Sequence, residues 1–335
     1  MSPSPIPQPP CIALDLEGPL SPQDCAFDLM ALIPEGRRLF ARISRYDDLL
    51  ALSGRPDYEP GDTLALIVPF LLGYGLEAAE VQALAGRATL VEGAADLVQG
   101  LYARGYRVHC LTTTYQQYAH PLCLRLGIPS LSVACTPFPL EELTARLRAQ
   151  DWQPVKAVTE KLLKLSDEDD AGLGRLLDAF YWQELPGTPL ELTLAAVRPL
   201  GGRRKLRALE RFALAAGVPL SRWAAVGDSI TDRDMLRAVR EAGGLPMAFN
   251  GNRYALEEAA FAVASVSLAD VEPLLRAWEE GGLEGARAFV AGSSRDPDGP
   301  SPHYHWLSEP PQLEKALSVH RRLRQHVRQQ AAPLG

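Results

Sequence analysis

The stretch that decides the fold of this chain is CIALDLEGPL, at residues 11–20. A short apolar run leads to Asp15 and Glu17, and the dipeptide Gly18-Pro19 follows them. Such a run is typical of a buried strand, and Gly-Pro turns the chain. Asp15 and Glu17 are therefore expected where a strand ends in a loop, which is the edge at which open α/β sheets bind ligands. Because two carboxylates at one edge repel each other, we expect a positive group beside them.

Three later stretches help to decide between a ligand site and a solvated strand end. They are VHCLTT at residues 108–113, Lys205 at the start of an amphipathic helix, and AAVGDSITD at residues 224–232. Each feature by itself is compatible with an ordinary turn or an exposed lysine, since single short motifs often mislead. Together they place polar groups at strand ends and at a helix start, which favours a site.

In this order the four stretches resemble the four motifs of the haloacid dehalogenase (HAD) superfamily of aspartyl-phosphate enzymes. Glu17 departs from the usual Asp-x-Asp of the first motif. The Asp-x-Glu-Gly form resembles the phosphoserine phosphatase-like branch, in particular phosphoserine:homoserine phosphotransferase, and also an archaeal hydrogenase-associated HAD group. Residues 111–122, LTTTYQQYAHPL, look like the same branch. The resemblance implies an α/β fold, with a Rossmann-like parallel sheet and a helical cap inserted after the first strand.

The two carboxylates of the first stretch can support phosphoryl transfer. Asp15 can attack phosphorus and form an aspartyl-phosphate, and Glu17 can protonate the leaving oxygen and later deprotonate water. Asp228 adds a hard oxygen ligand, which suits Mg²⁺ bound together with phosphate and water. The resemblance implies that Asp15, Asp228 and the main-chain carbonyl of Glu17 hold the Mg²⁺ ion.

The remaining polar groups are expected to bind the phosphoryl group or to support the site. Thr112 offers a hydroxyl and Thr113 a backbone N–H at the end of the second strand. Lys205 would balance the charge of Asp15 and of the phosphoryl group. By resemblance, Asp232 would orient water or Lys205. Arg203 and Arg204 are alternative candidates for this charge-balancing role. Lys205 is preferred because an amphipathic helix follows it, as in the family pattern.

Composition narrows the class of protein. The 335 residues are enough for two compact units, and the apolar fraction of 47% with a charged fraction of 22% fits a soluble globular protein. A net charge of −7 leaves no global basic field to attract nucleic acid or an anionic membrane, and no apolar run is long enough to span a bilayer. We expect a small phosphorylated metabolite as the partner, and a homodimer stays open.

Cysteine usage and the start of the sequence bear on location. Five cysteines form no CxxC pair, and their odd number and apolar surroundings indicate reduced thiols and a cytoplasmic protein. Residues 1–10 are rich in proline and lack the charged start and apolar centre of a signal peptide, so we expect them to be disordered.

Hydrophobic periodicity divides the chain into several segments. Helical stripes fill residues 23–87, the expected cap, and also residues 139–195, an expected accessory insert that contains no recognisable chemistry. Alternating strands and helices between these blocks predict parallel strands with right-handed crossovers. Expected strands include residues 130–134 and, as the last of the core, residues 261–266. The HAD core is assigned to residues 11–22, 88–138 and 196–280.

Residues 281–335 are expected to be a tail with an amphipathic helix. Leu313, Ala316, Leu323 and Val327 share one helical face, and four arginines are assigned to the rest of the helix surface, namely Arg321, Arg322, Arg324 and Arg328. A helix docked on its own domain is favoured over a role in binding nucleic acid or a partner.

These patterns predict a Mg²⁺-dependent phosphohydrolase that acts on a small phosphomonoester, with a phosphorylated amino acid as one candidate. Transfer of the phosphoryl group to a second alcohol stays open, because both reactions share one phospho-enzyme. A non-catalytic HAD-fold subunit of a larger complex is the alternative from another class.

Overall fold

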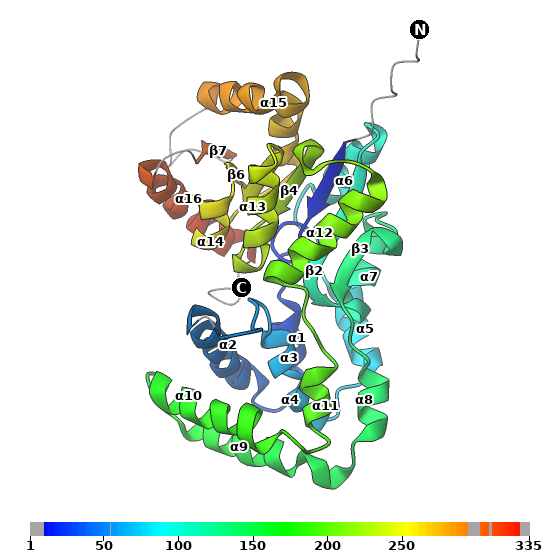
Figure 1. The fold of residues 1–335 in the computed structure, drawn as a ribbon, viewed down its shortest axis with the longest axis vertical. Helices are drawn as coiled ribbons and strands as arrows, with labels where there is room; N and C mark the ends of the chain where they lie inside the picture. Colours follow the sequence, from blue (N-terminus) through cyan, green and yellow to red (C-terminus); the bar gives the residue numbers. More distant parts are fainter. Residues whose placement is uncertain (1–9, 54, 294–301, 308–309, 329–335) are drawn as a thin grey trace.

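A single mixed sheet forms the centre of the molecule (Figure 1). The computed structural model describes residues 10–53, 55–293, 302–307 and 310–328, so the segment expected to be disordered lies outside the described residues apart from Pro10. The strand order is β3-β2-β1-β4-β5-β6-β7, and all strands are parallel except β7. Their bounds are β1 Cys11–Leu14, β2 Arg107–Tyr115, β3 Val133–Thr136, β4 Trp223–Gly227, β5 Leu245–Phe249, β6 Phe261–Ala264 and β7 His303–Trp306.

The first strand lies at the point where the strand order reverses. The chain runs outward from β1 to β2 and β3, then returns to place β4 on the other side of β1. In open α/β sheets, ligands bind beyond the carboxyl ends of the strands at such a switch point. Asp15 follows β1 and Asp228 follows β4, so the topology brings the first and last motifs together.

Side chains of β1 alternate between two cores. Ile12 and Leu14 join one apolar cluster, whereas Cys11 and Ala13 join the other, as the two-residue period of a strand requires. The first face is covered by α6 Ala94–Ala103, α7 Gln116–Arg125 and α15 Glu272–Gly292. The second face is covered by α12 Gly202–Ala216, α13 Arg233–Glu241, α14 Arg253–Glu258 and α16 Pro310–Arg328.

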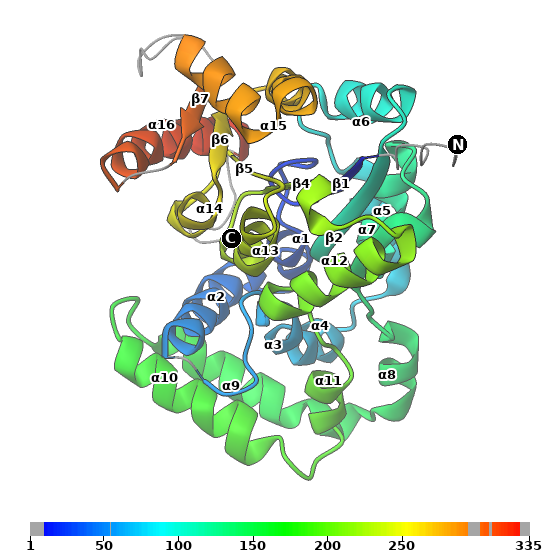
Figure 2. The same cartoon turned by 45° about the horizontal axis from the view of Figure 1, so that its top comes forward.

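The two helical blocks predicted from the sequence pack against each other below the sheet (Figure 2). Helices of the first block, α2 and α4, contact α9, α10 and α11 of the second. Arg42 of α2 donates hydrogen bonds to the carbonyl oxygens of Leu165 and Ser166, and the Tyr46 hydroxyl donates to Asp178. The blocks consist of α1 Cys25–Met30, α2 Gly36–Ser53, α3 Thr63–Leu66, α4 Val68–Gly73 and α5 Ala78–Arg87, and of α8 Leu140–Arg146, α9 Gln153–Lys164, α10 Asp170–Ala179 and α11 Glu191–Ala195.

One helix of the first block does not belong to this helical layer. Helix α5 packs against α7, which covers the sheet. Residues 23–87 therefore contribute both to the layer that faces the strand ends and to the surroundings of the sheet. The division into core, cap and accessory insert stays a prediction.

Two strand expectations differ from the structure. The strand expected at residues 130–134 begins only at Val133, because Ser130–Ser132 form a 3-10 turn and Leu131 is 94% exposed. The strand at residues 261–266 is not the last of the core, since β7 from the expected tail pairs antiparallel with it. Tyr304 and Trp306 of β7 pack against the apolar core, which explains why this short aromatic segment joins the sheet.

The C-terminal helix docks on its own domain. Helix α16 packs against β6, β7 and α14. Seven of its described side chains are buried, among them Ala316 and Leu323 of the expected face. Four of the seven recur every fourth residue, which corrects the expectation for two of the arginines; the four are Ala316, His320, Arg324 and Arg328. Among the described residues, none of the helices combines the length and the apolar character that crossing a bilayer requires.

Candidate active site

Asp15 lies at the carboxyl end of the central strand. Its backbone N–H donates to the carbonyl oxygen of Val226 over 3.0 Å, and its Oδ1 accepts a hydrogen bond from the Leu16 N–H at 2.7 Å. The side chain is almost fully buried. Burial raises the pKa of Asp15 well above its ordinary value, and Asp232 adds to this rise while Lys205 opposes it. Ionised Asp15 therefore depends on positive charge nearby.

Lys205 supplies part of that charge from the first turn of α12. Its Nζ lies 3.1 Å from Asp15 Oδ1 and 2.7 Å from Asp232 Oδ1, and the side chain has no exposed surface. Burial by itself would lower the pKa of Lys205, but the two carboxylates outweigh burial and raise this pKa above its ordinary value. The ammonium group is therefore a fixed positive charge between two motifs.

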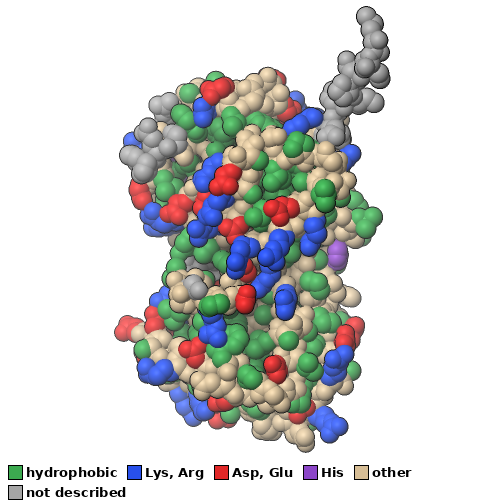
Figure 3. Space-filling view, viewed as in Figure 1, with side chains coloured by type: hydrophobic (Ala, Val, Ile, Leu, Met, Phe, Trp, Pro, Cys, Tyr) green, Lys and Arg blue, Asp and Glu red, His purple; other side chains and the backbone are tan. Residues whose placement is uncertain are grey.

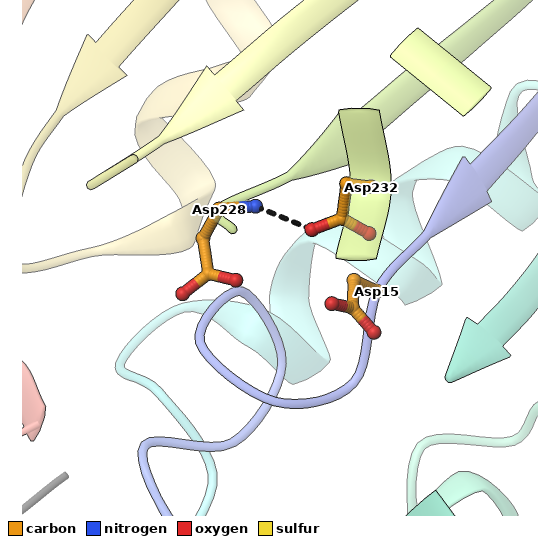
Figure 4. Close-up of side chains that lie close together, drawn as sticks. All are labelled: Asp15, Asp228 and Asp232. Carbon is orange, nitrogen blue, oxygen red and sulfur yellow. Dashed lines mark hydrogen bonds between the residues drawn. The ribbon is translucent and has the colours of Figure 1, made fainter. Parts of the chain in front are cut away.

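Asp232 positions the loop that carries Asp228. Its Oδ2 accepts hydrogen bonds from the backbone N–H groups of Asp228 at 2.9 Å and Ser229 at 3.1 Å. Figure 4 shows the side chains of Asp15, Asp228 and Asp232 close together, with Asp15 at the end of β1 and the hydrogen bond from the Asp228 N–H to Asp232 as a dashed line. One carboxylate oxygen from each of Asp15, Asp228 and Asp232 lies within 4.8 Å of the other two.

The loop after β1 fits closely around Asp228. Gly18 has a φ of 102°, and a Cβ at this position would lie 2.1 Å from Asp228 Oδ2. Glycine is therefore required both by the positive φ and by the approach of the carboxylate. The Gly18-Pro19 turn predicted from the sequence thus places the backbone of Gly18 directly against the Asp228 carboxylate.

The donor set fits a divalent cation. Asp228 is 1% exposed, and its Oδ1 has no hydrogen-bond partner among the described residues. A buried carboxylate oxygen without a partner is costly, and a hard cation held between this oxygen and Asp15 removes that cost. The carboxylates that would hold Mg²⁺ are those of Asp15 and Asp228, with Asp232 engaged by Lys205.

Glu17 follows Asp15 in the same loop and contacts the start of helix α1. Its Oε1 accepts a hydrogen bond of 2.6 Å from the Cys25 N–H at the start of α1, and its Oε2 lies 3.5 Å from the Thr113 hydroxyl. Burial, with a contribution from Asp24, raises the pKa of Glu17 to about 7. A carboxyl group with this pKa can both donate and accept a proton near neutral pH.

Of the other polar groups considered from the sequence, Thr113 lies in the cavity, whereas Thr112, Arg203 and Arg204 make contacts elsewhere. Thr113 lines the cavity beside Asp15, whereas the Thr112 hydroxyl is turned away and exchanges hydrogen bonds with Thr114. Arg203 and Arg204, the competitors of Lys205, pair with acidic groups that precede α3 instead of with Asp15. Those groups are Glu59 and Asp62.

Two arginines that sequence reasoning assigned to the surface lie in the site. Arg324 and Arg328, on the last turns of α16, both contact Asp228 Oδ2, and the distance from Arg328 Nη1 is 2.9 Å. The four-residue spacing from Ala316 placed them on one face, which was the available indication. This spacing does not by itself predict burial, because arginine is rarely buried unless it is paired and the partner is distant in the sequence.

Asp15, Glu17, Thr113, Asp228 and Arg328 line a cavity of about 80 Å³ between the strand ends and the helical layer. Figure 3 shows the molecule narrowed at this level, with Lys and Arg side chains gathered over α12. Six acidic side chains line the cavity, and Arg328 is the one cationic side chain among its described lining residues. The acids are Asp15, Glu17, Asp24, Asp47, Asp48 and Asp228.

Comparisons with known proteins agree with this architecture. No protein-family model matches the chain. A gene product from Archaeoglobus fulgidus has a TM-score of 0.84 and 25% sequence identity, and the match covers 98% of this chain and 99% of that one. A phospho-aspartyl intermediate analogue of phosphoserine phosphatase has a TM-score of 0.52 and 19% identity, covering 79% of this chain and 98% of that one. A curated phosphoserine phosphatase from Streptomyces coelicolor is 47% identical over 66 residues, which span 20% of this chain and 15% of that protein.

Proposed function

We propose that this chain, with the haloacid dehalogenase fold, is a divalent-cation-dependent phosphohydrolase. It would act on a small phosphomonoester through an aspartyl-phosphate. The observation that carries the proposal is the buried set formed by Asp15, Lys205, Asp228 and Asp232 at the switch point of the sheet. Mg²⁺ bound there would supply the charge that lets an anionic phosphoryl group approach a carboxylate.

In the first step, a carboxylate oxygen of Asp15 forms a bond to phosphorus, and the bond between phosphorus and the alcohol oxygen breaks. Glu17 gives its proton to the departing alkoxide, so a neutral alcohol leaves. Lys205 stays against Asp15 Oδ1 and offsets negative charge during the transfer. Burial of these groups strengthens each of these electrostatic interactions.

In the second step, water attacks the phosphorus of the aspartyl-phosphate. Glu17, now ionised, takes a proton from that water, and the bond between phosphorus and Asp15 breaks. Inorganic phosphate and the free carboxylate are the products. A pKa of about 7 for Glu17 supports this double role, because both protonation states are populated near neutral pH.

The acidic wall of the cavity supports a substrate with a positive group next to its phosphate. Asp24, Asp47 and Asp48 face the same cavity as Asp15. Carboxylates in this position would attract an ammonium group and repel a second anion. The ammonium group of a phosphorylated amino acid therefore fits these carboxylates, with its own carboxylate directed away from them, and the helices over the strand ends would act as its cap.

The test is Mg²⁺-dependent hydrolysis of p-nitrophenyl phosphate by the full chain. We expect Asp15→Asn to abolish hydrolysis and the formation of a phospho-enzyme. Glu280→Gln, at an exposed position of α15, is the control and should keep full activity. Activity that persists in Asp15→Asn, or no activity in the unaltered protein with any phosphomonoester, would contradict the proposal.

Leaving-group dependence tests the role of Glu17. Glu17→Gln should slow the hydrolysis of alkyl phosphates far more than that of aryl phosphates, because only a poor leaving group needs the proton. It should also let phospho-Asp15 accumulate, which mass spectrometry can detect. Equal slowing of both substrate classes without accumulation would remove Glu17 from the acid-base role.

A further inference from the structure

The C-terminal helix reaches the cavity from a part of the sequence that contains none of the four motifs. Arg328, on the last turn of α16, lies 100 residues after Asp228 in the chain and lines the same cavity as Asp15, Glu17 and Thr113. It is 7% exposed. A long cationic side chain buried at an acidic site requires a specific reason for being there.

The surroundings of Arg328 differ from those of Arg324, which lies one turn earlier on α16. Arg324 does not line the cavity, and its Nη1 lies 3.2 Å from the carbonyl oxygens of Asp228 and Asn250 in addition to contacting Asp228 Oδ2. Arg324 therefore holds the backbone and the carboxylate of the loop after β4. Arg328 lies one helical turn further along α16 and lines the cavity, with its Nη1 2.9 Å from Asp228 Oδ2.

The charges of the cavity explain why an anionic phosphoryl group would need Arg328. Six acidic side chains line the cavity, and Arg328 is the one cationic side chain among its described lining residues. A divalent cation held by Asp15 and Asp228 would offset part of this negative charge and leave the other acids of the lining in place. Loss of Arg328 would therefore weaken the attraction of the cavity for a phosphoryl dianion.

We propose that Arg328 is a substrate-binding residue that donates hydrogen bonds to the phosphoryl oxygens of the substrate. This inference rests on the proposed function, because it assigns a further residue to the same site. A guanidinium carries five N–H donors in a planar fork, so contact of Nη1 with Asp228 is compatible with donation to a second anion. Residues 310–328 thereby complete the active site from the end of the chain.

The experiment measures the binding of inorganic phosphate to the full chain at saturating Mg²⁺ by calorimetry. Arg328→Gln should weaken phosphate binding by about tenfold or more, because charge-assisted hydrogen bonds are lost. Arg328→Lys should weaken it less, since the charge stays while the planar fork is lost. Arg321→Gln, at an exposed position of the same helix, should bind phosphate within about twofold of the unaltered protein.

Mg²⁺ binding without phosphate separates a substrate contact from a structural role. Arg328→Gln should bind Mg²⁺ at least as tightly as the unaltered protein, because one competitor for Asp228 is removed. Loss of Mg²⁺ binding in this variant, or phosphate affinity within about twofold of the unaltered protein, would overturn the proposal. So would failure of the unaltered protein to bind phosphate in the presence of Mg²⁺.

The proposal stays testable if Arg328→Gln does not fold. A crystal structure of the unaltered protein with Mg²⁺ and tungstate should place the Arg328 guanidinium within about 3.2 Å of a tungstate oxygen. A guanidinium outside that distance would overturn the assignment. Phosphate binding is read directly, so a protein that binds phosphate through Arg328 but forms no phospho-enzyme would refute the proposed function and leave this inference standing.

Discussion

Helices α12 and α16 both deliver cationic side chains to the carboxylates at the sheet edge, but they do so in different ways. Lys205, from the first turn of α12, lies between Asp15 and Asp232. Arg324 and Arg328, from the last turns of α16, both contact the carboxylate of Asp228. One helix thus links two carboxylates through one cation, and the other holds one carboxylate through two cations.

This difference predicts how strongly the stability of the protein depends on each cation. Loss of Lys205 leaves two buried carboxylates without the ammonium group that they share, whereas loss of Arg324 leaves Arg328 against Asp228. Breaking a buried ion pair is costly mainly because an uncompensated charge remains. We therefore expect α12 to be more sensitive to substitution than α16.

Lys205→Met should have the largest effect. We expect the free energy of unfolding to fall by about 4 kcal/mol, because Asp15 and Asp232 lose a fully buried partner. Urea denaturation at pH 7 without Mg²⁺ measures this change. Arg207→Met, at an exposed position of α12, is the control and should change the free energy by less than about 0.5 kcal/mol.

Arg324→Met should destabilise the protein by a smaller amount, about 3 kcal/mol, because Arg328 continues to neutralise Asp228. The same urea denaturation applies, with Arg321→Met as the control on the exposed side of α16. A larger loss for Arg324→Met than for Lys205→Met would break the comparison between the two helices, and would show that Asp228 is the group most in need of a cation.

Mg²⁺ should stabilise the unaltered protein, because the cation binds the folded state through Asp15 and Asp228. At a concentration of about 100 times the dissociation constant, we expect a gain of about 2.7 kcal/mol in the free energy of unfolding. Thermal unfolding with Mg²⁺ and with a chelator measures the gain. Asp228→Asn should remove it, and a gain that survives this substitution would place the cation elsewhere.

Asp47 is a buried acid that accepts hydrogen bonds from neutral groups, in contrast to Asp15 and Asp228, which contact cations. Burial raises the pKa of Asp47 to about 7, although hydrogen bonds from Tyr58 and Thr63 act in the opposite direction. Because its pKa in the unfolded chain is about 4, the folded state holds this proton more tightly, and its contribution to stability declines as the pH rises from about 4 to about 7.

Asp47→Asn should therefore gain stability relative to the unaltered protein as the pH increases. Between pH 5 and pH 8 we expect this relative gain to amount to about 2.5 kcal/mol, because the amide does not titrate and its weaker hydrogen bonds act equally at both pH values. Urea denaturation at both pH values tests this. Parallel pH dependence of the two proteins would mean that Asp47 is ionised throughout the range.

Local sequence was sufficient for the parts of the site that lie at strand ends and at a helix start. The apolar run before Asp15, the Gly18-Pro19 turn and the Gly227-Asp228 turn each encode where a strand stops. Because parallel strands end at one edge of the sheet, these local signals also predict that the side chains meet. The predicted α/β fold is confirmed, with a sheet that is parallel except for β7.

Features that depend on contacts between distant segments were missed. The pairing of β7 with β6 and the packing of α2 against α9 and α10 have no local signature beyond a suitable pattern of side chains. The assignment of Arg324 and Arg328 to the surface was wrong for the same reason. A helical pattern identifies polar faces, but it does not show that one of these faces packs against the carboxylate of Asp228.

By itself, then, the sequence determined the strand ends, the carboxylates and Lys205, because these follow from short-range hydrophobic pattern and turn chemistry. Only the tertiary structure decided which cations neutralise Asp228. Burying an arginine is unfavourable until a partner is within hydrogen-bonding distance, and that partner stands about a hundred residues earlier in the chain. The ion pair that stabilises the buried Arg328 therefore forms only in the folded molecule.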